Sequence, residues 1–424
     1  MKYLLIVIAL LFSCSAQLKT QNQQTMQSSA FKPVPPLEPK GRVILGNENF
    51  IMNYSGMVKG KRVGLVTNQS GVNSQLVSTI DVFFNNPDIN LVALFGPEHG
   101  IRGDYFGGAS VSDNTDPKTG LPVYSLYGQT RKPTPEMLEN VDVILFDIQD
   151  IGNRSYTYIG TMGLLIEAAA ENNKEVIILD RPNPMGGEQV AGNIVHEGFF
   201  SLVGYYPIAY RYGMTIGEIA NMHNGEKKLG AKLTVIPMLN WKRDMYWPET
   251  GLSWVPTSPH VPYWETVLYI MATGTFGELH TISEGVGYTS PFEFAAAEWI
   301  NADDFAGALN NLKLPGVIFR PLHYKPYYFS FKDKELAGVQ LHITDIRAFK
   351  PFVTGLHIMK TAMTLYPDHD IFAESDRVSS FNRVMGSDAI TEGLKSGKSV
   401  EELQAEWQDE LNAFKKIREK YLLY

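Results

Sequence analysis

Residues 141–146, with the sequence VDVILF, end in the polar stretch Asp147-Ile148-Gln149-Asp150. Three further runs have the same character: residues 62–67 (RVGLVT), 90–95 (NLVALF) and 175–179 (EVIIL). Each run is short and rich in β-branched residues, which is typical of a strand buried on both faces. Residues 161–172 lie between two of these runs and carry apolar residues at helical spacing. The alternation predicts an α/β fold with a parallel sheet covered by helices on both sides.

Polar side chains follow each of the four predicted strands. In open α/β sheets the ligand crevice lies outside the carboxyl ends of the strands, so we expect these side chains to converge. Any one of them could instead cap a helix or shape a turn, but four coincident clusters favour a common site. The residues concerned are Asn68, Glu98, His99, Asp147, Gln149, Asp150, Asp180, Arg181 and Asn183.

The composition excludes several classes of protein. With 424 residues and 44% hydrophobic residues, the chain has enough apolar material for a large core, and its length favours two domains. A net charge of −8 without a Lys/Arg run argues against a nucleic-acid binder. The single cysteine, Cys14, excludes a disulfide framework and a cysteine-based metal centre.

The N-terminus has the pattern of an export signal. Lys2 precedes an apolar run at residues 3–12, which is shorter than the about 20 residues that span a bilayer. Leu11-Phe12-Ser13-Cys14 resembles a bacterial lipobox, so residues 1–14 are predicted to be a lipoprotein signal peptide. The alternative is a cysteine that merely ends a conventional signal. We expect an exported protein, lipid-anchored in the cell envelope and facing the periplasm.

The rest of the chain divides into a linker and two predicted domains. Residues 15–40 are rich in Gln and Pro and are predicted to be a flexible linker. Residues 41–240 form the strand–helix domain, and residues 241–424, where Trp, Tyr, Pro and Gly become dense, are predicted to be a smaller α+β domain. Capping boxes at Thr215/Glu218 and Ser399/Glu402 predict two helices, the second a continuous amphipathic helix toward the C-terminus.

Several nucleotide and hydrolase motifs are missing. No predicted strand is followed by GxGxxG, and the chain has neither a GxSxG nor an HExxH motif. Glu98 lies in a rigid, glycine-flanked turn, where a carboxyl group is a candidate general acid if burial raises its pKa. The alternative for Glu98 is a helix cap.

Residues 147–158 (DIQDIGNRSYTY) hold amides, carboxylates, an arginine and two tyrosines. These groups bind sugar hydroxyls and carboxylates or stack against sugar rings. Arg154 could instead form a structural ion pair, and Tyr156 and Tyr158 could pack in the core. Asn183 is presented between two prolines. In the second predicted domain, His260 and Glu284 are candidates across an interdomain cleft, with a solvated loop charge as the alternative for Glu284.

Several long motifs together resemble the exo-β-N-acetylmuramidase family, glycoside hydrolase family 171, over residues 43–424. They are GPEHGIRG (96–103), LPVYSLYG (121–128), FDIQDIGNRSYTY (146–158), LDRPNP (179–184), RYGMTIGE (211–218) and REKYLLY (418–424). The resemblance implies a Rossmann-like domain, a smaller second domain and a cleft between them. It implies release of N-acetylmuramic acid from the non-reducing end of peptidoglycan fragments, without a cofactor. The family's proposed catalytic glutamate falls on Glu98.

The chain departs from the family pattern in the second domain. The usual arginine and asparagine of one motif are replaced by Val286 and Thr281 within residues 278–289 (ELHTISEGVGYT). If that arginine binds the lactyl carboxylate of muramic acid, another cation must replace it. Arg102, Arg154 and Arg211 are the candidates.

We consider three hypotheses. In the first, a glycosidase uses Glu98 as general acid, with Asp147 or Asp150 as base or as the group that orients the substrate acetamide. In the second, a metal-dependent hydrolase uses His99, Asp104, Asp147 and Asp150. In the third, the chain is a non-catalytic glycan-binding lipoprotein. The predicted substrate-binding residues are Asn68, His99, Arg102, Gln149, Arg154, Tyr156, Tyr158, Asn183, Arg211, His260 and Glu284.

Overall fold

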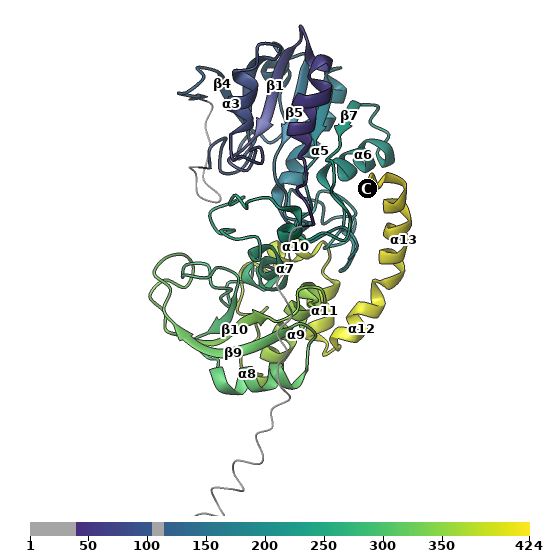
Figure 1. Ribbon diagram of the computed structural model, residues 1–424. Coiled ribbons are helices and arrows are strands. Elements are labelled where there is room, and N and C mark those ends of the chain that lie inside the picture. Colours follow the sequence, from purple (N-terminus) through teal and green to yellow (C-terminus); the bar gives the residue numbers. More distant parts are fainter. Residues whose placement is uncertain (1–39, 104–113) are drawn as a thin grey trace, which may run out of the picture. The chain divides into compact units, whose positions relative to one another are not determined.

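A seven-stranded sheet forms the first lobe of the computed structural model, which describes residues 40–103 and 114–424 (Figure 1). The strand order is β3-β4-β2-β1-β5-β6-β7, and all neighbours are parallel except β3 and β4. The strands are β1 Arg62–Thr67, β2 Asn90–Gly96, β3 Asn114–Thr115, β4 Pro122–Ser125, β5 Val143–Asp147, β6 Glu175–Leu179 and β7 Lys232–Ile236. The four predicted strands and the predicted fold class are therefore confirmed.

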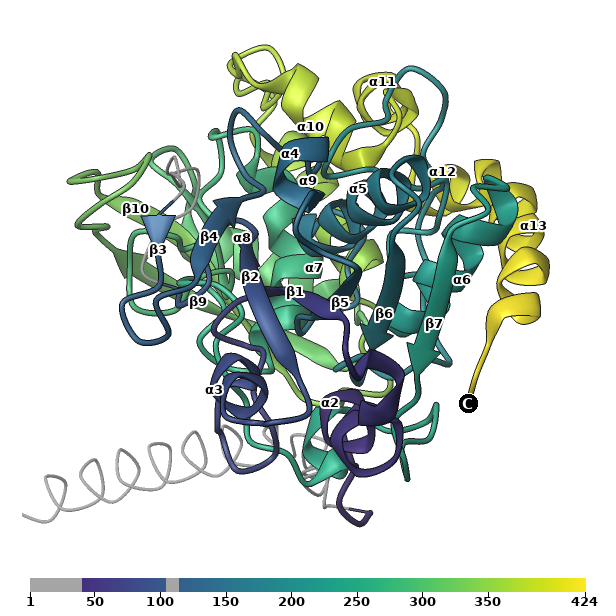
Figure 2. The ribbon, with the colours of Figure 1, turned by 90° about the horizontal axis from the view of Figure 1, so that it is seen from above.

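Side chains of the central strands alternate between two apolar layers. Val143 and Leu145 of β5 face a layer built with α3 (Thr79–Phe84) and with the short helices α2 (Gly46–Asn49), η1 (Phe50–Tyr54) and η2 (Ser55–Val58). Ile144 and Phe146 face the opposite layer, which includes α5 (Thr157–Glu171) and α6 (Ile216–Glu226). Figure 2 shows these helices on the two sides of the sheet. Burial on both faces explains why the strands read as continuous apolar runs.

The second lobe contains a three-stranded antiparallel sheet in the order β8-β10-β9, seen in the lower half of Figure 1. Its strands are β8 Phe294–Ala297, β9 Val317–Tyr324 and β10 Leu336–Ile343. Helix α9 packs against both α7 and α8. The remaining helices are α4 Pro135–Leu138, η3 Trp247–Thr250, α7 Thr266–Gly277, α8 Ala302–Asn311, α9 Pro351–Leu365, α10 Val378–Met385 and α11 Ala389–Lys395.

The C-terminal helix is not continuous, so the sequence prediction was wrong on this point. It consists of α12 (Val400–Glu406) and α13 (Gln408–Arg418), followed by η4 (Glu419–Tyr421). Trp407 separates α12 from α13 with φ −97° and ψ 4°, a conformation outside the helical region. Its buried ring packs edge-on against Phe352 of α9, with ring centroids 5.9 Å apart. Packing of this large ring accounts for the break. Both predicted capping boxes, at Thr215 and Ser399, are present.

The C-terminal segment returns to the first lobe, where α13 lies beside α6 (Figures 1 and 2). The hydroxyl of Tyr424 donates to Asp180 Oδ2 over 2.7 Å, and the backbone N–H of Leu423 donates to Glu218 Oε1 over 2.8 Å. Arg418 donates to the backbone carbonyls of Gly187 and Gly213. These contacts join the last residues to the segment between β6 and α6 and to the first turn of α6, within one compact unit of the chain.

The order of the strands defines where a ligand crevice lies. From β1 the chain proceeds to β2 and β4 on one side and then returns to β5 on the other side. A crevice at the carboxyl ends of such strands is the usual ligand site of open α/β sheets. Asn68 follows β1, and Gln149 and Asp150 follow β5, so these predicted residues flank that crevice.

The lipobox, the signal peptide, residues 15–39 of the predicted linker, and Asp104 lie outside the described residues. Within residues 40–103 and 114–424, none of the helices has the length and apolar character needed to cross a bilayer.

Candidate active site

Hydrogen bonds join the ends of β1 and β5 at the crevice. The hydroxyl of Ser70 donates to Asn68 Oδ1 over 2.5 Å and accepts the backbone N–H of Gln149 over 3.0 Å. All three residues are buried. Among the described residues, Asn68 Nδ2 and Gln149 Oε1 have no hydrogen-bond partner. Buried polar atoms without a partner are costly, so this pair marks a place where ligand groups would complete the bonding.

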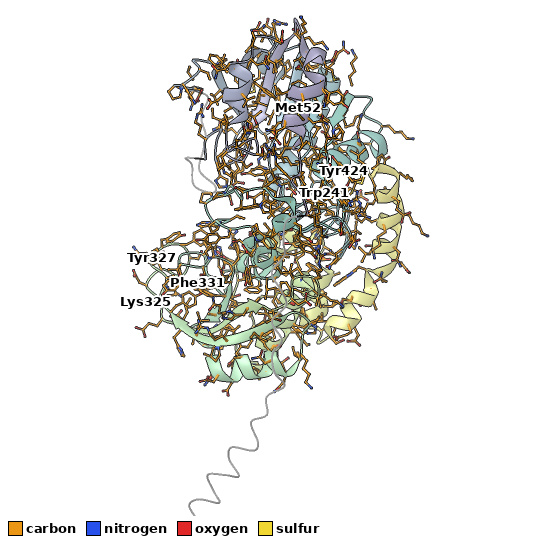
Figure 3. All side chains as sticks on the ribbon, in the orientation of Figure 1. Met52, Trp241, Lys325, Tyr327, Phe331 and Tyr424 are labelled. Atoms are coloured by element: carbon orange, nitrogen blue, oxygen red, sulfur yellow. The ribbon has the colours of Figure 1, made fainter. Side chains whose placement is uncertain are left out.

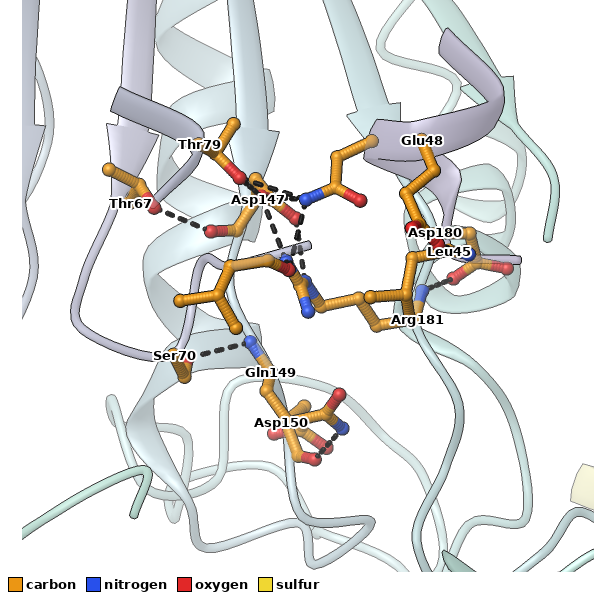
Figure 4. A network of polar contacts seen from close by, with 12 residues as sticks. Leu45, Glu48, Thr67, Ser70, Thr79, Asp147, Gln149, Asp150, Asp180 and Arg181 are labelled. Atoms are coloured by element: carbon orange, nitrogen blue, oxygen red, sulfur yellow. Dashed lines mark hydrogen bonds and ion pairs between the residues drawn. The ribbon is translucent and has the colours of Figure 1, made fainter. Parts of the chain in front are cut away.

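Asp147 forms a buried ion pair with Arg181 (Figure 4). Arg181 donates from Nε to Oδ1 over 2.6 Å and from Nη2 to Oδ2 over 2.9 Å. Oδ2 also accepts from the hydroxyl of Thr79 at 2.5 Å and from Asn47 Nδ2 at 3.2 Å. Both carboxylate oxygens are therefore occupied, and the Asp147 side chain is fully buried. The arrangement suits a structural clamp rather than a group that exchanges protons with substrate.

Asp150 lies three residues further on in a different environment. Its Oδ2 accepts the Tyr212 hydroxyl and the backbone N–H of Gly152, the latter over 2.7 Å. Its Oδ1 has no hydrogen-bond partner among the described residues. Among the described residues, no cationic side chain contacts the Asp150 carboxyl group. Burial raises the pKa of Asp150 to about 6. Asp150 can therefore take up or release a proton near neutral pH.

Glu98 lies in the loop after β2 and is only partly buried. The hydroxyl of Thr157, at the start of α5, donates to Glu98 Oε2 over 3.0 Å. Burial, together with the neighbouring carboxylate of Glu98, raises the pKa of Tyr127 to about 12. Tyr127 is therefore a neutral hydroxyl beside Glu98. The adjacent His99 is buried with φ 73°, a left-handed conformation that few non-glycine residues adopt and that concentrates at functional sites.

Tyr156 and Tyr158 form hydrogen bonds with a second loop, at Thr257. Tyr156 donates its hydroxyl to Thr257 Oγ1 over 2.8 Å, and Tyr158 donates to the Thr257 carbonyl over 2.7 Å. Gln69 Nε2 donates to the same carbonyl over 2.8 Å. The two tyrosine rings meet edge to face, 4.9 Å apart. Burial raises the pKa of both phenols, so they act as neutral donors.

His260 connects this loop with the second lobe. Its Nε2 lies 3.0 Å from the Tyr328 hydroxyl, in the loop between β9 and β10. Burial, and after it the charge of His99, lower the pKa of His260. Glu284 lies next to α7 in the second lobe, where burial raises its pKa to about 7. The loop that carries His260 is thus joined to Tyr156 and Tyr158 through Thr257, whereas Glu284 is placed beside α7.

All three candidate arginines are bound by the protein itself, and two of them are buried. Arg154 is fully buried and donates to the carbonyls of Asn193, Ile208, Val384 and Met385. Arg211 is buried and donates to the Met185 carbonyl and to Gln189 Oε1. Arg102 forms two 3.0 Å bonds with Asp116 and keeps 34% of its side chain exposed. Of the three, Arg102 is the one with a partly exposed side chain.

Two predicted residues shape turns. Asn183 donates from Nδ2 to the Met214 carbonyl over 2.9 Å and accepts the Met185 N–H over 3.0 Å. Asp180 accepts from the Thr215 hydroxyl over 2.7 Å and from the Gly217 N–H over 2.8 Å, at the start of α6. The sequence left open that Asp180 has a structural role in a turn or cap rather than a role in binding, and these contacts agree with a structural role.

The structure adds residues that the sequence reasoning did not select, namely Tyr127, Thr157, Tyr212, Thr257 and Tyr328. Three of them, Tyr127, Thr157 and Tyr212, lie inside the quoted motifs. The motifs therefore pointed to their segments, but not to these individual residues. Thr257 and Tyr328 lie outside the quoted motifs.

Carboxyl groups, amides and phenols, rather than phosphate-binding loops or a nucleophilic serine, surround the crevice. Among residues 40–103 and 114–424, no three His, Cys, Asp or Glu side chains are placed to hold a metal ion. A partly buried glutamate, a protonatable aspartate and hydroxyl-binding amides define a carboxylate-based hydrolase for a hydroxyl-rich substrate.

Comparison with known proteins specifies the family. Residues 63–265 match the model "Exo-beta-N-acetylmuramidase NamZ, N-terminal", and residues 267–424 match the C-terminal model of the same family. The chain is 45% identical over 385 residues to the peptidoglycan β-N-acetylmuramidase NamZ of Bacillus subtilis (strain 168), covering 91% of this chain and 92% of that relative. The chain belongs to the exo-β-N-acetylmuramidase NamZ family of glycoside hydrolases.

Two crystal structures of DUF1343 family proteins from Bacteroides fragilis NCTC 9343 are similar to this fold. One has a TM-score of 0.87 and 47% identity, covering 91% of this chain and 100% of that chain. The other has a TM-score of 0.72 and 28% identity, covering 91% and 99%. Both lobes of the described structure therefore have counterparts in solved relatives.

We predict that Asp147→Asn destabilises the fold by about 3–5 kcal/mol, because it leaves the buried Arg181 without its counter-charge. Urea unfolding at pH 7 measures the change. Asp142→Asn is the matched control, since Asp142 and Arg62 form an ion pair in which each side chain is about 40% exposed, and such pairs contribute at most about 1 kcal/mol. Equal shifts for the two variants would contradict the clamp role.

Asp150→Asn is predicted to change the pH dependence of stability. The pKa of Asp150 is raised from 3.8 to about 6 in the folded state, so its contribution is most favourable below pH 3.8 and is lost as pH rises through 6. An asparagine cannot ionise and therefore avoids this loss. Relative to wild type, the variant should gain up to about 3 kcal/mol between pH 4 and pH 7. Parallel pH profiles of the two proteins in urea unfolding would refute this prediction.

Proposed function

We propose that this protein is an exo-acting β-N-acetylmuramidase that removes N-acetylmuramic acid from the non-reducing end of peptidoglycan fragments, with Glu98 as the general acid. The position of Glu98 carries this proposal. Glu98 is the partly exposed carboxylate beside the crevice, and Thr157 and Tyr127 orient it. The name of the Bacillus relative and the match to both family models support the same activity.

Glu98 would protonate the glycosidic oxygen as the bond to the anomeric carbon breaks. The Thr157 hydroxyl donates to Glu98 Oε2, which restrains the rotamer, and the Tyr127 hydroxyl lies beside the same carboxyl group. His99, in its left-handed conformation, holds the backbone of this loop in the turn that presents Glu98. Positioning of this kind reduces the entropy lost in reaching the transition state.

Asp150 is the better candidate for the second carboxyl group. Asp147 is neutralised by Arg181, whereas Asp150 keeps one oxygen without a protein partner among the described residues. Asp150 would either accept a proton from water or bind the N–H of the substrate acetamide. In both roles its carboxyl group, held by Tyr212 and Gly152, would act on the sugar that is released.

The remaining polar groups suit the sugar itself. Asn68 Nδ2 and Gln149 Oε1 offer a donor and an acceptor to ring hydroxyls. Arg102 would pair with the lactyl carboxylate that distinguishes muramic acid from glucosamine, because its side chain stays 34% exposed while it holds Asp116, whereas Arg154 and Arg211 are buried.

Glu98→Gln should lower kcat by at least about 100-fold, since general acid catalysis contributes that much or more. The assay uses three substrates: a natural muramic-acid-terminated disaccharide and the chromogenic β-glycosides of N-acetylmuramic acid and of N-acetylglucosamine. Each substrate is assayed with and without chelator. The loss should be smaller on the chromogenic muramic substrate, whose leaving group needs less protonation, and chelator should have no effect. Glu139→Gln, an exposed glutamate, is the control.

Full turnover by Glu98→Gln would exclude the role given to Glu98. An equal loss on both muramic substrates would argue for a structural effect. Tight glycan binding by wild type without any turnover would favour the non-catalytic alternative.

We further propose that Cys14 carries a lipid that anchors the protein in the bacterial envelope, where peptidoglycan fragments occur. The lipobox-like Leu11–Cys14 sequence supports this proposal. Cys14→Ser, expressed as the full chain, should move from the membrane fraction to the soluble fraction, with Ser13→Ala as the control. Unchanged membrane association of Cys14→Ser would refute the anchor.

A further inference from the structure

The loop between β9 and β10 exposes three consecutive aromatic side chains. Tyr327 is 57% exposed, Tyr328 39% and Phe329 54%. Isolated exposed apolar residues are ordinary, whereas a contiguous group marks a surface that meets a ligand or partner. Figure 3 shows Tyr327 on the periphery of the second lobe, with Lys325 and Phe331 of the same loop close by.

The backbone of this loop is fixed in an unfavourable conformation. Phe329 has φ 67°, which bulky residues rarely adopt, and Asp333 has φ 64°. Tyr327 donates its N–H to the Gly287 carbonyl over 3.0 Å, and Asp333 donates to the Pro326 carbonyl over 2.8 Å. Strained residues persist where the surroundings hold them, and they concentrate at ligand clamps. The aromatic rings are therefore presented by an ordered loop.

This aromatic group is continuous with the candidate active site. Tyr328 contacts His260 through its hydroxyl at 3.0 Å, and the two rings stack with centroids 6.0 Å apart. His260 stands three residues after Thr257, which accepts hydrogen bonds from Tyr156 and Tyr158 of the candidate site. From Tyr328 the ring contacts continue to the more exposed Tyr327, 5.4 Å away, and Tyr327 lies 6.0 Å from the partly buried ring of Tyr288. Ring contacts thus connect the candidate-site loop at residues 257–260 with the exposed aromatic group.

The chemistry of this path suits the sugar chain that leaves the site. An enzyme that removes the terminal non-reducing sugar encloses that one ring and must let the rest of the glycan extend outward. Pyranose rings have one face of C–H groups, which the electron-rich face of tyrosine or phenylalanine attracts, while tyrosine hydroxyls bind sugar hydroxyls.

Resting on the glycosidase function proposed above, we propose that Tyr327, Tyr328 and Phe329 form an aglycone platform that binds the sugar rings on the reducing side of the scissile bond. The platform makes the enzyme favour longer glycan strands over short fragments. Each ring that stacks adds affinity for the leaving portion of the substrate without touching the reacting atoms.

The test compares an unlinked peptidoglycan glycan strand of several disaccharide repeats with the chromogenic β-glycoside of N-acetylmuramic acid. In Tyr327→Ala, the ratio of kcat/KM on the strand to kcat/KM on the chromogenic glycoside should fall by roughly threefold to tenfold, mainly through KM. Tyr327→Phe retains the ring and should keep most of the ratio. Phe84→Ala, a 43% exposed aromatic at the end of α3, is the matched control and should keep the wild-type ratio.

An unchanged ratio in Tyr327→Ala would overturn the platform even if the enzyme is fully active. Absence of turnover by wild type would instead overturn the proposed function. In that case calorimetric titration with the same strand decides the platform: weaker binding to Tyr327→Ala than to wild type would support it, and equal binding would refute it.

Discussion

The buried ion pair between Asp147 and Arg181 is the interaction on which the rest of the site depends. A buried pair is tolerated only when its geometry is good and its remaining bonds are satisfied. Here the contact is bidentate, and Thr79 and Asn47 complete the bonding of the carboxylate. Because Asp147 ends β5 and Arg181 follows β6, the pair fixes the starting points of the two loops that supply Gln149, Asp150 and Asn183.

The same pair separates the roles of two carboxylates that are three residues apart. Arg181 pairs with the buried carboxyl group of Asp147, whereas Asp150 has only neutral donors around it among the described residues, and burial raises the pKa of Asp150 to about 6. Different environments of this kind allow one fold to give two nearby carboxyl groups different roles. Glu98, carried by β2 on the other side of β1, then faces a crevice whose geometry is already set.

The sequence predicted the central strands because a strand buried on both faces is a continuous apolar run. It predicted that the polar residues after these strands lie together because the carboxyl ends of parallel strands meet at one edge of the sheet. It did not predict β3, β4 and β7, which are short or lie toward the edges of the sheet. It did not distinguish Asp147 from Asp150, since the pairing with Arg181 depends on β5 and β6 being neighbours. The sequence also did not predict that Arg154 binds backbone carbonyls, because these carbonyls, at residues 193, 208, 384 and 385, are distant from it in sequence.

Residues 278–289, where the chain departs from the family pattern, gain a physical meaning from the second lobe. Val286 is buried, and the neighbouring Gly287 has φ 101°, with its carbonyl accepting the N–H of Tyr327. A Cβ at Gly287 would collide with the Tyr328 carbonyl oxygen, so this glycine allows the loop with the three aromatic residues to approach. An arginine at position 286 would require a partner for its charge, whereas valine packs without one. This segment therefore supports the aromatic loop, so under the two proposals made above the second lobe would bind the leaving glycan and the first lobe would carry the acid chemistry.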